Sequence, residues 1–259
     1  MNAVNDLAGA GRTALVTGAS RGIGRAIAVR LAADGAAVIV HFGADEVGAA
    51  ATADEIERAG GTAVTVRAEL GVEDDVDTLF AGVEAALAGR PLDILVNNAA
   101  AAPAGPLGAT TRQEFDHLFA VNVRAPYFII QRALDLLPDG GRIITISSVA
   151  TRMANPSQTS FAMTKGAVET MSMTLANELG VRGITVNAVA PGATRTAANG
   201  SFFEAPGLAE LIAGTTALGR LGRPDDVADV VAFLASDAAR WITGQVIDAS
   251  GGLFLGPRV

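Results

Sequence analysis

A hydroxyl and an amine accompany an aromatic residue in the middle of the chain, at Ser148, Lys165 and Phe161. Ser148 follows the apolar run 143–146, which has the length and composition of a buried strand. Phe161 and Lys165 are four residues apart in a segment of helical character, which puts both on one face of a helix. Open α/β sheets bind ligands at the carboxyl ends of their strands. The pattern therefore predicts a site at this strand end, although Phe161 contributes no titratable group to it.

A glycine-rich stretch, residues 17–24, directly follows another apolar run, 13–16. Gly18, Gly22 and Gly24 allow a tight turn and a close approach of the backbone to a pyrophosphate, and the N-terminus of the next helix adds positive potential. A glycine triplet alone is weak evidence, but its place after the first strand of an alternating pattern is specific. The stretch therefore indicates a dinucleotide-binding turn rather than only a tight connection.

The elements that would position these residues alternate between short β-branched runs and longer helical segments. Alternating strands and helices form right-handed βαβ units, so their sheet is parallel and is covered on both faces. We therefore predict an α/β fold with a single Rossmann-type, doubly wound parallel sheet of about seven strands, in one domain over residues 1–259. The predicted strands are 13–16, 37–40, 63–66, 94–96, 143–146, 184–186 and 245–247. The predicted helices are 22–33, 49–58, 74–87, 112–137 (as two stretches or one bent helix), 161–179 and 224–234.

The composition excludes several classes of protein. The absence of cysteine excludes disulfides, thiolate catalysis and zinc–thiolate sites, and the formal charge of −8 disfavours nucleic acid as a partner. His41 and His117 lack the spacing of metal ligands, so we expect both to be structural and predict no metal site. No apolar run approaches about 18 residues, and the first ten residues lack the features of a signal peptide. We expect a cytoplasmic protein that has no membrane partner.

A set of motifs runs through most of the chain. They are Thr17-Gly18-x-x-x-Gly22-x-Gly24, Asn97-Asn98-Ala99, Asn122, Ser148, Lys165, Pro191-Gly192, Gly222-Arg223-Pro224, Thr243-Gly244-Gln245 and Asp248-Ala249-Ser250-Gly251-Gly252. Together they resemble the classical branch of the short-chain dehydrogenase/reductase (SDR) family over about residues 12–252. The resemblance is closest to the members similar to 3-oxoacyl-(acyl-carrier-protein) reductase. It implies hydride transfer between a nicotinamide cofactor and a small carbonyl or alcohol substrate.

The resemblance also implies a cofactor whose phosphates lie against the backbone around Ser20, Arg21 and Ile23. In the family an acidic residue after the second strand binds the ribose diol of NAD, and Phe42 stands at that position. The missing carboxylate, together with Arg21, favours NADP(H) over NAD(H), although Asp45 leaves NAD(H) open. The residues matched to cofactor contacts are Gly18, Ser20, Arg21, Gly22, Ile23, Gly24, Phe42, Glu69 (for the usual Asp near the adenine), Leu70, Asn98, Ala99, Ala100 (for the usual glycine), Lys165, Pro191, Gly192, Thr194 and Thr196.

The reaction of the family uses four side chains. A Ser orients the carbonyl, a Tyr exchanges the proton, a Lys lowers the pKa of that Tyr and holds the nicotinamide ribose, and an Asn holds a water of a proton relay. By position, Ser148, Lys165 and Asn122 match three of these residues, and Phe161 takes the place of the Tyr. A benzene ring fills the space of a phenol but can neither protonate an alkoxide nor polarise a carbonyl.

No nearby residue is a good substitute for the missing phenol. The single tyrosine, Tyr127, lies five residues after Asn122, where we expect a packing role or a subunit contact. Gln158 occupies the position, seven before Lys165, at which the enoyl-reductase branch carries its Tyr. The hydroxyls just before Phe161 are too weakly acidic, which leaves a water bound to Lys165 as a proton relay. A positioned general acid typically contributes about 10²–10⁴-fold, so we expect slow turnover with cofactor binding intact.

Three accounts of Phe161 are open. In the first, Phe161 is an engineered Tyr-to-Phe change that traps a substrate complex. In the second, it is a natural variant in an enzyme that still transfers hydride by using Ser148 and water. In the third, the protein is a family member that no longer catalyses a redox reaction. The first two accounts predict an NADP(H)-dependent oxidoreductase that acts on a carbonyl or alcohol. The third predicts a nucleotide-binding homologue that has no redox turnover or has a non-redox enzymatic role.

The segment 191–215 begins with a stretch that is rich in Pro, Gly and Ala and poorly periodic, which predicts a mobile loop over the substrate. By resemblance, Thr196 would reach the cofactor. Phe202 and Phe203 suggest an apolar substrate wall, with a core or subunit contact as the equal alternative. Members of the family are commonly tetramers, and the apolar residues 253–255 fit a subunit contact. We therefore expect a homo-oligomer, either a tetramer or a dimer.

Overall fold

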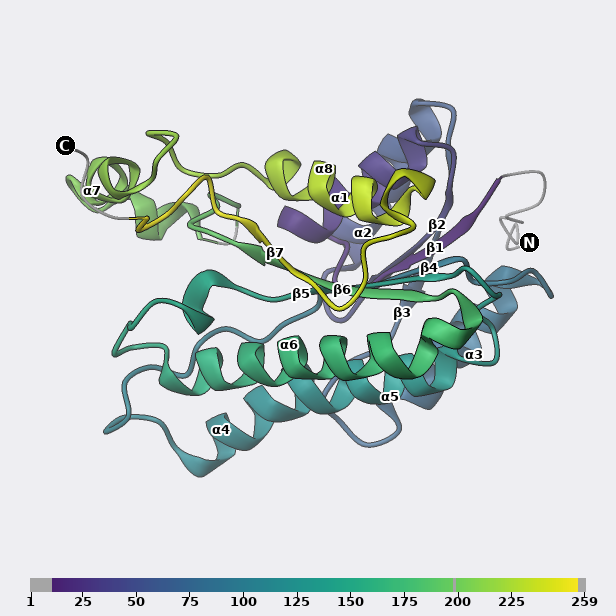
Figure 1. Ribbon diagram of the computed structural model, residues 1–259, viewed down its shortest axis with the longest axis horizontal. Coiled ribbons are helices and arrows are strands. Elements are labelled where there is room, and N and C mark those ends of the chain that lie inside the picture. The colour runs from purple at the N-terminus through teal and green to yellow at the C-terminus, as the bar shows by residue number, and fades with distance from the viewer. Residues whose placement is uncertain (1–10, 198, 256–259) are drawn as a thin grey trace.

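A central sheet with helices packed on both of its faces makes up the computed structural model, which describes residues 11–197 and 199–255 (Figure 1). The remaining residues of the predicted domain, including residue 198 of the predicted loop, lie outside the described part. The sheet has seven parallel strands in the order β3-β2-β1-β4-β5-β6-β7, which confirms the predicted Rossmann-type fold. The strands are β1 (Thr13–Val16), β2 (Ala37–Phe42), β3 (Thr62–Arg67), β4 (Ile94–Asn97), β5 (Arg142–Ile146), β6 (Thr185–Pro191) and β7 (Val246–Ala249).

The strand order reverses beside β1. Val16 of β1 pairs with Val40 of β2 on one side and with Val96 of β4 on the other. The chain runs outward from β1 to β3 and then crosses back to β4, so the carboxyl ends of β1 and β4 border a crevice. Doubly wound sheets bind their ligands at such a reversal, and the fold brings the glycine-rich stretch 17–24 and residues 97–99 together there.

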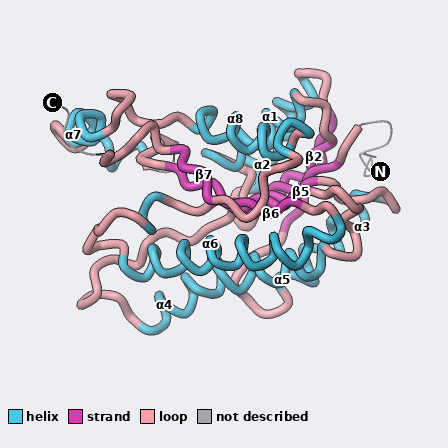
Figure 2. The backbone as a smooth tube through the Cα atoms, in the orientation of Figure 1, coloured by secondary structure: helices cyan, strands magenta, loops and turns pink. Residues whose placement is uncertain are grey.

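The helices divide between the two faces of the sheet, as Figure 2 also shows. Strand β1 is buried on both sides, because Val16 packs in the core under α1 and α8 whereas Leu15 packs in the core under α3 and α5. One face carries α1 (Gly22–Ala33), α2 (Glu46–Arg58) and α8 (Pro224–Ala235). The other face carries α3 (Asp75–Leu87), α4 (Arg112–Phe119), α5 (Ala125–Ala133) and α6 (Thr159–Leu179).

Several elements begin or end at residues other than those predicted. Helix α2 begins at Glu46 rather than at residue 49, because the Asp45 carboxylate accepts a hydrogen bond of 3.0 Å from the Gly48 N–H and caps the helix. Strand β2 continues to Phe42 because that residue still pairs with Arg67 of β3. Strand β6 continues to Pro191 for the same reason, since it pairs with β7 along its last four residues.

The predicted helix 112–137 is two α-helices joined by a π-helix, Ala120–Arg124. A capping box begins α4, in which the Thr111 side chain accepts from the Glu114 N–H and the Glu114 carboxylate accepts from the Thr111 N–H. Helix α5 ends at Ala133, four residues before the predicted end. The backbone is helical without a break from Arg112 to Ala133, so the predicted helix is one continuous helix that a π-helical turn divides into two α-helical stretches. Such turns are frequent at functional sites.

The segment 191–215 is more ordered in secondary structure than the predicted loop. It contains a 3₁₀-helix, Gly200–Glu204, and an α-helix, α7 (Leu208–Thr215), which lies outside the two helical layers near the C-terminal end in Figure 1. Thr194 forms an isolated β-bridge with Gly222, which holds the start of the segment against the residues before α8. None of the helices in the described ranges combines the length and the apolar character that a bilayer span requires.

Candidate active site

The glycine-rich turn after β1 is tied to the loop after β4 by reciprocal hydrogen bonds. The Thr17 hydroxyl oxygen accepts from the backbone N–H of Asn98 at 2.9 Å and of Ala99 at 3.0 Å. In return, the Asn98 amide donates to the carbonyl oxygens of Thr17 at 2.8 Å and Gly18 at 3.1 Å. The predicted cofactor residue Asn98 thus shapes the turn, and Ala100, two positions on, is exposed at the mouth of the crevice.

The turn has room for a phosphate and none for extra side chains. Gly18 has a φ of +64°, and a Cβ on it would lie 2.9 Å from the Cα of Ala99. A Cβ on Gly24 would lie 2.2 Å from the Gly18 carbonyl oxygen and 2.4 Å from the Asn98 amide nitrogen. Helix α1 begins directly after Arg21, whose side chain forms no capping hydrogen bond. The first N–H groups of α1 are therefore available to an anion, and these features fit the pyrophosphate of a dinucleotide.

The residues predicted for the adenosine end of the cofactor divide into buried and exposed ones. Phe42 is only 5% exposed and lies in the core with residues of α1 and α2. Leu70 is also buried, whereas Glu69 and Arg21 are exposed. The Asp45 carboxylate, which left NAD(H) open, caps α2 instead.

The loop after β6 turns back towards the glycine-rich turn. Strand β6 ends at Pro191, and Thr194 is buried just after it. A Cβ on Gly22 would lie 3.5 Å from the Thr196 side chain, so the two segments are in near contact. The Asn199 carboxamide oxygen accepts hydrogen bonds from the Thr196 backbone N–H at 2.7 Å and from the Thr196 hydroxyl at 3.0 Å. The Asn199 amide nitrogen donates to the Thr194 carbonyl oxygen at 2.9 Å. The segment is thus held over the start of α1.

Lys165 is a buried cation beneath the Phe161 ring. Lys165 is only 5% exposed, and its ammonium donates a hydrogen bond of 2.8 Å to the Ile146 carbonyl oxygen. The ammonium lies 5.4 Å from the centre of the Phe161 ring. Burial lowers the pKa of Lys165 to about 8, and the negative charge of Glu169 opposes that shift. At neutral pH most of the molecules therefore keep a proton on this amine.

Ser148 stands at the end of β5 with its hydrogen free to donate. Its hydroxyl oxygen accepts from the Ala150 N–H at 3.1 Å, and the residue is half-buried. Glu169 lies below this strand end, where one carboxylate oxygen accepts from the Ser147 hydroxyl at 2.6 Å and from the Thr151 hydroxyl at 3.1 Å. Sequence reasoning missed Glu169, although its place one helical turn after Lys165 was a usable signal.

Asn122 lies in the π-helix and is 2% exposed. Its carboxamide oxygen accepts from the Ala101 N–H at 2.8 Å, and its amide donates to the Thr164 hydroxyl at 3.2 Å. The Thr164 hydroxyl in turn donates to the Phe161 carbonyl at 2.7 Å. The Asn122 side chain thereby joins the loop after β4 to the turn of α6 that carries Phe161. Thr164 also was missed from the sequence, because a threonine three residues after Phe161 gives no signal of its own.

The structure supplies no phenol near Phe161 within the described residues. Tyr127 lies on α5, half exposed, with its ring against Phe128 at 5.2 Å between centres. Gln158 immediately precedes α6, and its side chain makes no capping bond. Lys165 is therefore the titratable side chain closest in sequence and contact to Phe161.

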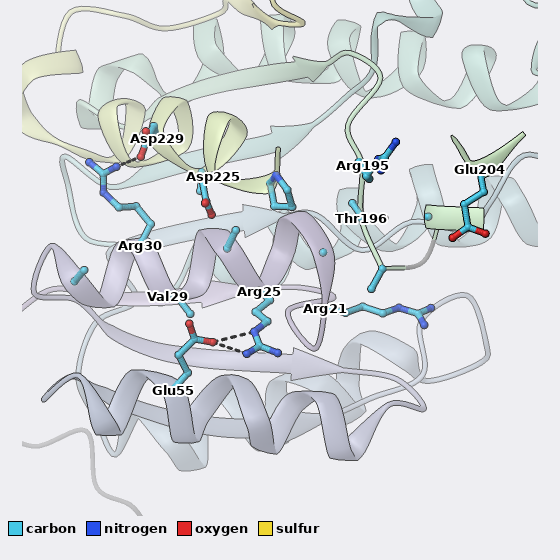
Figure 3. Close-up of a pocket in the computed structure, with 17 residues that line it drawn as sticks. Arg21, Arg25, Val29, Arg30, Glu55, Arg195, Thr196, Glu204, Asp225 and Asp229 are labelled. Carbon is cyan, nitrogen blue, oxygen red and sulfur yellow. Dashed lines mark hydrogen bonds and ion pairs between the residues drawn. The ribbon is translucent and has the colours of Figure 1, made fainter. Parts of the chain in front are cut away.

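A cavity of about 800 Å³ opens beside the glycine-rich turn rather than at Ser148 (Figure 3). It runs from Arg21 and Thr196 along the outer side of α1 towards α8. Figure 3 shows the Arg25 guanidinium bonded to the Glu55 carboxylate, with an N–O distance of 2.6 Å, and both residues line the cavity. Ser148, Phe161 and Lys165 do not line this cavity, so it adjoins the glycine-rich turn and is separate from the predicted catalytic residues.

Comparisons with known proteins agree with this geometry. The family model described as enoyl-(acyl carrier protein) reductase matches residues 18–254. The chain is 52% identical to the reductase LugOII, which catalyses keto-reduction at C1 during lugdunomycin biosynthesis, over 95% of this chain and 98% of that one, with a TM-score of 0.91. It is 51% identical to the angucycline C-6 ketoreductase LanV with bound NADP, over 95% and 96% of the two chains, with a TM-score of 0.90. It is also 41% identical to the versicolorin reductase stcU of Emericella nidulans, over 94% of this chain and 96% of that protein.

Proposed function

The chain belongs to the short-chain dehydrogenase/reductase family, and on that premise we propose that it is an NADP(H)-dependent ketoreductase that works without the usual phenol. The observation that carries the proposal is Lys165, a buried amine that keeps its proton at neutral pH and contacts the Phe161 ring at the end of β5. The NADP in the LanV structures and the uncapped start of α1 support this cofactor. Polycyclic aromatic ketones are the substrate class, which the names of LanV and the versicolorin reductase support.

When bound, the cofactor supplies the hydride that reaches the carbonyl carbon. The residues of this chain bind the carbonyl oxygen of the substrate and supply its proton. Ser148 donates its hydroxyl hydrogen to that oxygen, because a carbonyl oxygen can only accept. The bond from the Ala150 N–H holds the Ser148 hydroxyl oxygen in place. Lys165 provides the proton at Nζ, relayed through a water, since Phe161 has none to give. The Phe161 ring fills the space above Lys165 and keeps bulk solvent from the ammonium.

The Asn122 side chain positions the catalytic helix. Its bonds to Ala101 and Thr164 fix α6 against the loop after β4, so Phe161 and Lys165 are held at the crevice before substrate arrives. A preorganised site lowers the barrier without reorganisation during the reaction. The missing phenol removes a general acid that is typically worth about 10²–10⁴-fold, so slow turnover belongs to this proposal.

A nucleotide-binding protein without redox turnover is the rival function, and Phe161 is the observation that favours it. The test is NADPH and NADH binding by cofactor fluorescence, followed by single-turnover oxidation at the nicotinamide absorbance band with a panel of polycyclic aromatic and simple ketones. We expect tighter binding of NADPH than of NADH, and slow oxidation with at least one aromatic ketone. If NADPH binds but is not oxidised with any ketone of the panel, the nucleotide-binding function without redox turnover is favoured. If NADPH does not bind, both proposed functions are overturned.

A further inference from the structure

A buried histidine, His41, bonds the glycine-rich turn to the end of β3. Its Nδ1 accepts a hydrogen bond of 3.1 Å from the backbone N–H of Gly18, and its Nε2 lies 2.9 Å from the carbonyl oxygen of Ala68. The backbone carbonyl of His41 also accepts from the Ala19 N–H at 2.8 Å. His41 of β2 therefore bonds the backbone N–H groups of Gly18 and Ala19 on one side and the carbonyl that follows β3 on the other.

The two contacts fix the charge and the tautomer of the ring. A carbonyl oxygen can only accept, so Nε2 must carry the hydrogen that it donates to Ala68. The Gly18 N–H can only donate, so Nδ1 must be unprotonated. The side chain is therefore a neutral imidazole with both nitrogens occupied, and it is 2% exposed. An apolar residue of similar size would fill the same space but would leave two backbone groups unpaired in the core.

The two anchored points belong to two different segments that are matched to the cofactor. Gly18 begins the turn that cradles the phosphates, and Ala68 directly precedes Glu69 and Leu70, which are matched to the adenine end. The ring thus sets the separation between the phosphate-binding and adenine-binding segments. Gly18 has little freedom on its other side, because the Asn98 amide bonds its carbonyl at 3.1 Å. Loss of the Nδ1 acceptor would release only the side of Gly18 that faces β2.

We propose that His41 is a positioning residue for the nucleotide, which holds the Gly18 peptide at the place that tight NADPH binding requires. The inference rests on the cofactor of the proposed function, but not on catalytic turnover. It concerns the Nδ1 acceptor in particular. The bond from Nε2 to Ala68 supports the strand end, and its loss should affect stability more than affinity.

Two amide substitutions separate the two ring nitrogens. In His41→Asn the carboxamide oxygen falls near the position of Nδ1, so the acceptor for Gly18 is kept and the bond to Ala68 is lost. In His41→Gln the amide lies one carbon further out, near Nε2, so the bond to Ala68 is kept and Gly18 loses its acceptor. A matched control is Asn187→Ala on β6, because Asn187 is 1% exposed and also bonds two backbone groups, at Ile242 and Gln245.

The experiment measures the NADPH dissociation constant by cofactor fluorescence and Tm for the full-length wild-type protein and the three variants. We expect His41→Gln to raise the dissociation constant about 10-fold, as the loss of one hydrogen bond predicts. His41→Asn should stay within about 3-fold of wild type, although its Tm falls, and Asn187→Ala should lower Tm without a change in affinity. The single-turnover rate at saturating NADPH should be the same for the Phe161→Tyr variant and for the double variant that combines Phe161→Tyr with His41→Gln.

Equal affinities for His41→Gln and His41→Asn would overturn the proposal. If His41→Gln does not fold, His41→Asn decides alone, because a folded His41→Asn protein with weakened NADPH binding contradicts a role for the Nδ1 acceptor. Wild-type protein that binds NADPH but reduces no ketone refutes the proposed function and leaves the His41 comparison decisive. Wild-type protein that binds no NADPH refutes both.

Discussion

The Lys165 ammonium lies 5.4 Å from the centre of the Phe161 ring, one turn further along α6. A cation near the face of an aromatic ring is attracted to it, so this contact holds the ring where the family places its tyrosine. The ring and the amine thus keep their arrangement, and the missing atom is the phenol oxygen. The consequences of that arrangement can be tested separately.

Phe161→Tyr should raise the single-turnover rate of ketone reduction by about 10²–10⁴-fold, because it returns a positioned general acid beside Lys165. The NADPH dissociation constant should stay the same, since the change lies away from the glycine-rich turn. Tyr127→Phe is the control, because Tyr127 is half exposed on α5 and should not affect the rate. A Phe161→Tyr variant that is folded, binds NADPH and reduces nothing on the panel would refute a ketoreductase function.

The rate of the wild-type protein should fall as the pH rises through about 8, where Lys165 loses its proton. The protonated amine is the proton source, so activity is retained below this pH and lost above it. The Glu169 charge raises the pKa of Lys165, so Glu169→Gln should move the midpoint to lower pH. A single-turnover pH profile from 6 to 10 measures both effects, with the exposed Glu178→Gln on the same helix as control. An unchanged midpoint in Glu169→Gln would exclude Lys165 as the titrating donor.

Unfolding free energy should decrease as the pH falls from about 6.5 to about 4. Burial lowers the pKa of His41 from 6.5 to about 4, with the hydrogen bond to Ala68 as an opposing effect. Between these values the unfolded chain binds more protons than the folded one, so acid favours unfolding. The lost stability amounts to at most about 3 kcal/mol for this residue. Urea titrations at several pH values should show this component in wild type and in the exposed-residue control His117→Asn, and should not show it in His41→Asn.

Gly24→Ala should weaken NADPH binding strongly and lower stability by about 1–3 kcal/mol. The new Cβ would lie 2.2 Å from the Gly18 carbonyl oxygen, so α1 must move away from the turn. Gly214→Ala on α7 is the matched control, because its Cβ position points into open space, with no atom within 4 Å other than those of its chain neighbours and its own helix backbone. That change should add up to about 1 kcal/mol of stability through helix propensity, with NADPH affinity unchanged. Wild-type affinity in Gly24→Ala would contradict the assignment of the turn to the cofactor.

The sequence was sufficient to predict the parallel sheet and the glycine-rich turn after β1. The runs before Thr17 and Ser148 are apolar, short and β-branched, and glycines stand where the backbone must approach a ligand. Strand and helix ends were less predictable, because they depend on partners that are distant in sequence. Phe42 extends β2 only because Arg67 pairs with it, and a neighbouring strand cannot be read from residues 37–42 alone.

The side-chain bonds of the site were the least predictable part. Nothing local indicates that Asn122 lies in a π-helix, and its bond to Thr164 joins residues that are distant in sequence. The sequence does not show that the Asp45 carboxylate, which leaves NAD(H) open, also caps α2. His41 was predicted to be structural, and its two backbone partners became evident only when β1, β2 and β3 were assembled.

The bonds between Thr17 and Asn98 make the shape of the glycine-rich turn depend on a residue that follows β4, about eighty positions later in the chain. A nascent chain that ends before β4 contains the whole glycine-rich turn but lacks the residue that shapes it. The turn is therefore not an autonomous nucleotide-binding unit, and NADPH selects only the fully assembled sheet. A ligand that binds the folded state alone stabilises it by about 2.7 kcal/mol at a hundred times its dissociation constant. Bound NADPH would therefore stabilise the assembled sheet as a whole rather than the glycine-rich turn alone.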